Sequence, residues 1–499
     1  MEKEGVMKRT RFCRRAGGLL LAAAIGLCVG CAGDDPPVPG QVSDGNWGEY
    51  PGANDTLPWE FTETTGEATT TLSVSPPETT TGTAGTSAAG TSTGSAATSA
   101  TTAGTTSTKP PAPQIQGEFR GVWVSHYEME DLLTGKDAAG ARAALDTLMD
   151  NCRSYGMNAV ILHVRANSDA YYKSKIFKPV KSVQALIAGG FDPLAYAVQA
   201  AHKRGLQLHA WLNPYRIGTD ESYAVGDNAK QDVWFSKFSN SQYNRRCYYY
   251  IPTSTTAQKT ILDGVREIVE GYDVDGIHFD DYFYPNNSDS KIGINHKQAE
   301  SFETGFKPGG GQSLGDWRRA AVDALVSQVY AIVHRKKNCV FGISPSHNIT
   351  RARETEYADT TKWLANRGYI DYLCPQVYFG FEHNSSAFDT CTKEWLRQKK
   401  ASSVSLLIGV GIYKTGIADD EWADHSLPAG TGARGEWANH DDIMKRQVEF
   451  LRGQKDIGGM LFYSYSYFDP AAKGELKGAN LETAKREVEH VLPLLKAKT

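Results

Sequence analysis

The ten residues Asp273-Val274-Asp275-Gly276-Ile277-His278-Phe279-Asp280-Asp281-Tyr282 place a short apolar strand directly before two acidic side chains. The apolar residues of this stretch suit a strand that is buried inside a parallel sheet. His278, Asp280 and Tyr282 alternate with period 2 and therefore share one face of the strand. Acids at the carboxyl end of a parallel barrel strand are typical of active-site residues. The alternative is a solvated turn after a strand, and the polar alternation disfavours it.

Seven further stretches have similar β-branched or aromatic character, and helical patterns separate them. The predicted strands are Phe119–Ser125, Ala159–Val164, Gln207–Leu212, Gly276–Asp280, Val340–Ser344, Tyr372–Tyr378, Ser405–Ile412 and Gly459–Ser464. The predicted helices are Ala138–Tyr155, Pro193–Arg204, Ala257–Gly271, Gly315–Arg335, Tyr357–Arg367, Thr392–Lys400, His440–Arg452 and Leu481–Leu495. Eight strands alternating with helices over about 380 residues predict an α/β fold, a (β/α)8 TIM barrel. A doubly wound open sheet is the alternative, but no glycine-rich phosphate-binding turn follows any of these strands.

The predicted strands end in polar and aromatic residues, which a barrel would gather at one end. Any single residue of this kind commonly just forms an ordinary hydrogen bond within the fold. The inference therefore depends on the concentration of such residues at one end of every strand. Aromatic faces stack on the C–H faces of sugar rings, while amides, imidazoles and guanidinium groups hold hydroxyls, so this set suits a glycan. The candidate binding residues are Arg165, Asp169, His209, Trp211, Asn213, Tyr215, Arg216, His278, Tyr282, His347, Gln376, Tyr378 and Tyr463.

Residues 1–31 have the pattern of an export signal. Basic residues up to Arg15 precede the apolar run Ala16–Val29, whose length of about 14 residues is short for spanning a bilayer, so a retained transmembrane helix is the weaker alternative. Leu27-Cys28-Val29-Gly30-Cys31 resembles a bacterial lipobox, although Cys28 stands where leucine is usual. Lipidation of Cys31 would tether the protein to the outer face of the cytoplasmic membrane of a bacterial cell envelope. An ordinary cleaved signal, and hence a secreted protein, is the alternative.

Residues 32–115 are predicted to be a linker. From about Phe61 to Pro113 the composition is dominated by threonine, serine, glycine, alanine and proline, which bury too little apolar area to offset the entropy of ordering. About fifty flexible residues reach on the order of 40 Å, enough to lift a domain away from a membrane. The folded, catalytic domain is therefore expected at residues 116–499.

Charge and cysteine content disfavour several other classes of protein. The net charge is −4, and no basic stripe follows the signal, which makes a nucleic-acid partner improbable. The five cysteines after the signal are odd in number and lack CxxC spacing, which disfavours both a disulfide framework and a zinc cluster. The histidines at the strand ends are spread over five strands, so we expect neither a metal site nor a cofactor.

Four motifs in this order carry a resemblance to a known family: Phe119-Arg120-Gly121-Val122-Trp123-Val124, His209-Ala210-Trp211-Leu212-Asn213-Pro214-Tyr215-Arg216, Asp275-Gly276-Ile277-His278-Phe279-Asp280-Asp281-Tyr282 and Pro375-Gln376-Val377-Tyr378. The chain resembles the glycosyl-hydrolase-like family with a glycoside-hydrolase-10-like barrel. The resemblance extends from Glu118 to about Phe468. That family includes bacterial envelope lipoproteins and an enzyme that cuts denuded peptidoglycan glycan strands. The resemblance implies a (β/α)8 domain, a glycan substrate and hydrolysis at the top of the barrel.

Glycoside hydrolysis normally requires two carboxyl groups, one neutral and one ionised. Asp280 is the first candidate, because the frame Gly276-Ile277-His278-Phe279-Asp280 is similar to the fourth strand of amylase-type barrels, where this position carries the nucleophile. Asp281 would point the other way if the strand continued, which suits a supporting or capping residue. It is the second candidate for the catalytic role. His278 is expected to orient Asp280.

The partner acid is open among three residues. Glu382 follows the sixth strand in an aromatic setting that would raise its pKa by desolvation. Glu436, beside Trp437, is its rival, and Asp169 is a third choice. In chitinase-type enzymes the corresponding strand ends in a glutamate where this chain has Tyr282, which argues against substrate-assisted chemistry of that type.

The leading hypothesis is an envelope-anchored glycoside hydrolase that acts on a cell-wall glycan, with peptidoglycan strands as the first choice. A second hypothesis keeps the chemistry and changes the substrate to an external α- or β-glucan. A third, of a different class, is a noncatalytic carbohydrate-binding barrel that has lost one acid.

Overall fold

The computed structural model describes residues 117–218, 233–237, 246–284, 311–420 and 426–497, together with 303, 305–307, 309 and 423. The predicted signal, Cys31 and the predicted linker lie outside the described residues. No helix in the described ranges is both long and apolar enough to cross a membrane.

Eight parallel strands close into a barrel in the spatial order β1-β13-β12-β11-β10-β9-β5-β2. Their bounds are β1 (Phe119–Val124), β2 (Ala159–Arg165), β5 (Gln207–Leu212), β9 (Gly276–Phe279), β10 (Val340–Ile343), β11 (Tyr372–Leu373), β12 (Ser405–Val410) and β13 (Ile457–Phe462). The pairing of β1 with β13 joins the first strand to the last, so the sheet has no open edge. The predicted (β/α)8 barrel is confirmed, and the open-sheet alternative is wrong.

One strand is much shorter than predicted. β11 contains only Tyr372 and Leu373, and beyond it Gln376 makes isolated bridges to Ser346 and Gly409. Pro375 lies between these two segments and has no N–H to donate, which interrupts the ladder. The chain nevertheless continues along the barrel wall to Tyr378.

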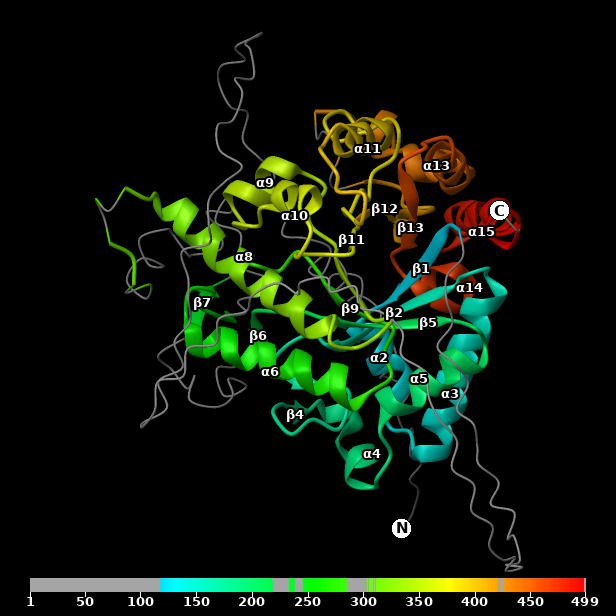
Figure 1. Cartoon of the computed structure of the whole chain (residues 1–499). Coiled ribbons are helices and arrows are strands. Elements are labelled where there is room, and N and C mark those ends of the chain that lie inside the picture. The colour runs from blue at the N-terminus through cyan, green and yellow to red at the C-terminus, as the bar shows by residue number, and fades with distance from the viewer. Residues whose placement is uncertain are drawn as a thin grey trace, which may run out of the picture. The chain divides into compact units, whose positions relative to one another are not determined.

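Helices surround the barrel in Figure 1. Their bounds are α2 (His126–Leu133), α3 (Ala138–Ser154), α4 (Gln184–Ala188), α5 (Pro193–Lys203), α6 (Thr255–Gly271), α8 (Leu314–Val333), α9 (Ile349–Glu354), α10 (Thr360–Ala365), α11 (Phe388–Leu396), α12 (Glu436–Asn439), α13 (Ile443–Arg452), α14 (Pro470–Lys473) and α15 (Gly478–Lys496). Side-chain caps define several starts, among them Ser254 for α6 and Ser313 for α8. All eight predicted helices occur, with ends displaced by up to four residues.

Helix α2 was not predicted. It begins directly after β1, where Ser125 is the N-cap and Glu128 completes a capping box. Glu128 is buried and also accepts hydrogen bonds from Ser464 Oγ at 2.8 Å and Ser466 N at 2.7 Å. Because Ser464 and Ser466 follow β13, this carboxylate ties together the carboxyl ends of the first and last strands.

Two small sheets lie in the loops that follow β2 and β5. The segments β3 (Asp169–Ala170) and β4 (Lys178–Pro179) pair in parallel. The strands β6 (Arg216–Gly218), β8 (Arg246–Tyr250) and β7 (Val233–Lys237) form an antiparallel sheet in that order. These insertions extend the end of the barrel at which the parallel strands finish.

Candidate active site

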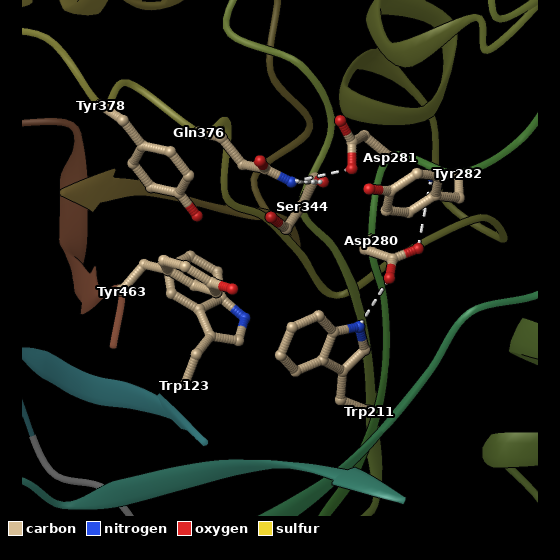
Figure 2. A pocket seen from close by; sticks show the side chains of 9 residues that line it. All are labelled: Trp123, Trp211, Asp280, Asp281, Tyr282, Ser344, Gln376, Tyr378 and Tyr463. Carbon is tan, nitrogen blue, oxygen red and sulfur yellow. Dashed lines mark hydrogen bonds between the residues drawn. The ribbon is translucent and has the colours of Figure 1, made fainter. Parts of the chain in front are cut away.

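A pocket opens at the carboxyl ends of the barrel strands, and nine side chains from six strands or their ends line it (Figure 2). It encloses about 310 Å³ including its open mouth, which is at the lower end of the size range of small-molecule sites. The lining residues are Trp123, Trp211, Asp280, Asp281, Tyr282, Ser344, Gln376, Tyr378 and Tyr463. The pocket thus collects seven of the residues singled out from the sequence, and adds Trp123 and Ser344.

Asp280 is buried at the wall of this pocket, with 3% of its surface exposed. Its Oδ2 accepts a hydrogen bond from Trp211 Nε1 at 2.8 Å, and its Oδ1 accepts one from the backbone N–H of Tyr282 at 3.3 Å. Burial raises the pKa of Asp280 to about 7, and the neighbouring charge of Asp281 adds to the rise against the lowering effect of these donors and of Arg216. Asp280 therefore retains a large protonated fraction at neutral pH, which suits a proton donor better than a nucleophile.

Asp281 lines the same pocket. β9 ends at Phe279, so the strand alternation does not continue and both acids reach the cavity. Asp281 Oδ1 accepts a hydrogen bond from Gln376 Nε2 at 3.2 Å, and the same amide also donates to the carbonyl of Ser344 at 3.0 Å. Burial raises the pKa of Asp281, while the bond from Gln376 opposes that rise.

The two adjacent carboxyl groups act as a coupled pair. The negative charge of Asp281 disfavours ionisation of Asp280, so the pair retains a proton on Asp280 more readily. One neutral and one ionised carboxyl are the two components that glycoside hydrolysis uses.

Aromatic side chains form the opposite side of the pocket. Figure 2 shows Trp123, Tyr378 and Tyr463 facing the two acids across the cavity. The ring centroid of Trp123 lies 6.3 Å from that of Tyr378 and 6.1 Å from that of Tyr463, both in edge-to-face geometry. Trp123, Tyr378 and Tyr463 are 1%, 6% and 9% exposed, so they give the pocket a tightly packed aromatic wall.

His163 is a further polar group beside the pocket, and it was not among the predicted binding residues. Its imidazole stacks on the Trp211 indole with centroids 3.6 Å apart and planes 8° from parallel. The side chain is buried, and neither ring nitrogen has a hydrogen-bond partner. Burial lowers its pKa well below the usual value, so His163 backs Trp211 as a neutral ring.

His278 has different partners from those expected. Its ring hydrogen-bonds to Trp123 and Tyr372 in the barrel interior, so Trp211 and the backbone of Tyr282 orient Asp280 instead. His209 also lies in the interior, where it bonds to Tyr372.

The two glutamates considered as partner acids do not line the pocket. The Glu382 side chain is 45% exposed and pairs with His440 at 3.2 Å. Glu436 is buried, and its two carboxylate oxygens accept the backbone N–H groups of Phe381 at 2.7 Å and Glu382 at 3.0 Å. This carboxylate therefore holds the loop after β11 in place.

The remaining predicted binding residues do not line the pocket. The Arg216 guanidinium lies 4.6 Å from the centre of the Tyr282 ring. Arg165 is fully buried with its guanidinium 4.7 Å from the Phe177 ring centre. Burial raises the pKa of Asp169 to about 6. Three others are buried outside the lining: Asn213, Tyr215 and His347.

A third carboxyl lies behind the acidic pair. Glu356 is 4% exposed, one of its oxygens lacks a hydrogen-bond partner, and Arg351 Nε is 3.4 Å from the other. Burial raises its pKa to about 8, with a further contribution from the charge of Asp281. Its position follows a short helix in a polar stretch, which gives no periodic signal in the sequence. Among the described residues, no group of three or more potential metal ligands is found.

Comparison with known proteins identifies related sequences. A family model described as Glycosyl hydrolase-like 10 matches residues 118–424. Glycosyl hydrolase YngK of Bacillus subtilis is 32% identical over 339 residues, which cover 62% of this chain and 64% of that protein. The chain thus spans just under two thirds of the length of that relative. Glycosyl hydrolase DigH of Escherichia coli K12 is 28% identical over 399 residues, which cover 72% of this chain and 87% of that protein.

Among solved structures, the PgaB (BpsB) glycoside hydrolase domain from Bordetella bronchiseptica is similar, with a TM-score of 0.48 and 13% sequence identity. The match covers 77% of this chain and all of that domain.

Proposed function

This chain belongs to the glycosyl hydrolase-like 10 family, and from that premise we propose that it hydrolyses glycosidic bonds of a bacterial cell-wall glycan, with peptidoglycan strands as its substrate. The observation that carries the proposal is the coupled pair Asp280 and Asp281 at the end of β9, facing an aromatic wall in one pocket.

In the proposed reaction, protonated Asp280 donates its proton to the glycosidic oxygen, and the bond from that oxygen to the anomeric carbon breaks. The ionised Asp281 stabilises the positive charge that develops on the sugar ring. A water molecule adds to the anomeric carbon, and its released proton returns to Asp280. The Trp211 indole and the Tyr282 backbone hold Asp280 in place throughout.

The choice of peptidoglycan is supported by two features of the sequence. The pattern of residues 1–31 suits export with lipidation at Cys31, and residues 32–115 suit a tether. An anchored barrel on such a tether would meet the wall layer before any external glycan. The resemblance to a family that contains a hydrolase of denuded glycan strands points to the same polymer.

The test is incubation of the purified full chain with peptide-free and with peptide-bearing peptidoglycan strands, with products analysed by mass spectrometry. We expect shorter glycans from the peptide-free strands and none with the Asp280→Asn variant. Products from amylose or cellulose alone would replace the wall glycan with an external glucan. Glycan binding by both proteins without any product would favour the noncatalytic barrel.

Envelope anchoring has a separate test. Metabolic labelling with palmitate should mark the wild-type chain in the membrane fraction. The Cys31→Ala variant should lose the label. An unlabelled wild-type chain in the culture medium would instead support a cleaved signal and secretion.

A further inference from the structure

A continuous line of hydrogen bonds runs through the interior of the barrel, starting at the pocket. Trp123 Nε1 lies 3.1 Å from His278 Nε2, and His278 Nδ1 lies 2.8 Å from the hydroxyl of Tyr372. The same hydroxyl lies 3.0 Å from His209 Nδ1, and His209 Nε2 lies 3.2 Å from Gln207 Oε1. Five side chains from four strands are thereby linked from the carboxyl end of the barrel towards its opposite end.

The direction of every bond in this line follows from its first member. An indole N–H can only donate, so Nε2 of His278 must accept and the proton of the neutral ring is on Nδ1. That N–H donates to Tyr372, whose own hydrogen then points to Nδ1 of His209. His209 consequently carries its proton on Nε2 and donates it to Gln207. The two histidines are therefore fixed in opposite tautomers.

The protonation states of these groups agree with that direction. Burial lowers the pKa of His278 well below the usual value and that of His209 to about 4. Burial also raises the pKa of Tyr372 far above its usual value. At neutral pH both rings are therefore uncharged and the phenol keeps the hydrogen that it donates.

The barrel makes room for this line with glycines on neighbouring strands. A Cβ added at Gly342 would lie 1.9 Å from Cζ of Tyr372, and one added at Gly276 would lie 2.7 Å from Nδ1 of His209. Aliphatic side chains in place of His209, His278 and Tyr372 would fill the same interior space without any polar group. The interior instead holds a fully hydrogen-bonded network, which in a low dielectric strongly favours one arrangement.

We propose that the line Trp123-His278-Tyr372-His209-Gln207 positions the pocket wall, with Tyr372 as the positioning residue that fixes the plane of the buried Trp123 indole at the inner side of that wall. Trp123 uses its only donor inside the barrel, and Trp211 uses its only donor on Asp280. Neither indole therefore offers an N–H to the cavity. Trp211, which is 7% exposed, presents ring carbons to the apolar face of a sugar, whereas Trp123, which is 1% exposed, supports the pocket wall from within the core.

The test compares Tyr372→Phe with Tyr172→Phe. Tyr372→Phe removes the central hydroxyl and keeps the ring, whereas Tyr172 is equally buried but lies in the outer core between strands and helices. The first measurement, nitrogen NMR of the wild-type histidines, needs no substrate. We expect the Nδ1–H tautomer for His278 and the Nε2–H tautomer for His209. The Trp123 indole N–H signal should shift and broaden in Tyr372→Phe and stay unchanged in Tyr172→Phe.

The kinetic part rests on the proposed function and uses peptide-free peptidoglycan strands. In Tyr372→Phe we expect KM to rise about fivefold, the size of one lost hydrogen bond, with kcat per folded molecule within about twofold of the wild type. The same tautomer in both histidines would overturn the positioning role. An unmoved Trp123 signal together with an unchanged KM would also overturn it. If the wild type does not cleave these strands, the proposed substrate fails, and the tautomers and the Trp123 signal still decide whether the line exists as described.

Discussion

Two buried carboxyl sites on the same side of the barrel differ in what their oxygens touch. Asp280, at the end of β9, receives an indole N–H and one backbone N–H at the wall of an open pocket. Glu436 is equally buried, but its two oxygens receive the N–H groups of Phe381 and Glu382, and it does not line the pocket. Burial alone therefore does not identify a reacting acid. Access to the cavity separates the two sites, because the pKa of Glu436 is also raised by the charge of a second carboxyl, that of Glu382.

The largest expected effect is the loss of activity in Asp280→Asn. The amide cannot deliver a proton to the leaving oxygen, so kcat/KM should fall by about a thousandfold or more. In the wild type, kcat/KM should decline as the pH rises through about 7, because Asp280 then loses the proton that it must donate. A wild-type rate that rises through pH 7 instead would assign Asp280 to the nucleophile.

The coupling itself is tested by Asp281→Asn. This change removes the negative charge that helps to raise the pKa of Asp280. The alkaline limb of the pH profile should therefore move towards acid, while kcat falls roughly tenfold at its optimum. Asp150→Asn, which changes an exposed acid on α3, should leave both the limb and the rate in place. An unmoved limb in Asp281→Asn would show that the two carboxyls titrate independently.

The role of Glu436, the buried carboxylate outside the pocket, is tested by Glu436→Gln. An amide can accept only through its oxygen, so one of the two buried N–H groups loses its partner. Chemical denaturation should show a loss of about 1–3 kcal/mol in the free energy of unfolding. The kcat of the molecules that remain folded should stay within a few-fold of the wild type. A thousandfold drop in kcat with unchanged stability would make Glu436 an acid of the reaction.

Residues on the barrel strands could be grouped from the sequence alone. Each barrel strand carries a local apolar run, and period 2 alone indicated that Asp280 and Tyr282 share the face of His278. Strand ends in a closed barrel converge, so residues from distant segments such as Trp211, Gln376 and Tyr463 could be grouped without coordinates. Trp123 lies on the inner face of β1 by the same periodicity and could have been added to that group.

The loop carboxylates could not be assigned in this way. Glu436 reaches backbone groups more than fifty residues earlier in the chain, and no local pattern encodes that contact. The orientation of His278 likewise depends on Tyr372, which lies 94 residues away. Two features that were not predicted, the early end of β11 and the helix α2, did have local signals in the sequence. Pro375 interrupts the ladder after β11, and Ser125 with Glu128 forms the capping box of α2.

The smallest expected effect belongs to Glu382→Gln. Its exposed side chain pairs with His440 at the surface, and pairs of this kind contribute about 0–1 kcal/mol. Its backbone N–H, rather than its carboxylate, is what Glu436 binds, and the substitution leaves that N–H in place. We therefore expect unfolding and kcat/KM to match the wild type within error when both are measured beside Glu436→Gln. A large loss of kcat in Glu382→Gln would mean that the loop after β11 closes over the substrate and brings this carboxylate to the acidic pair.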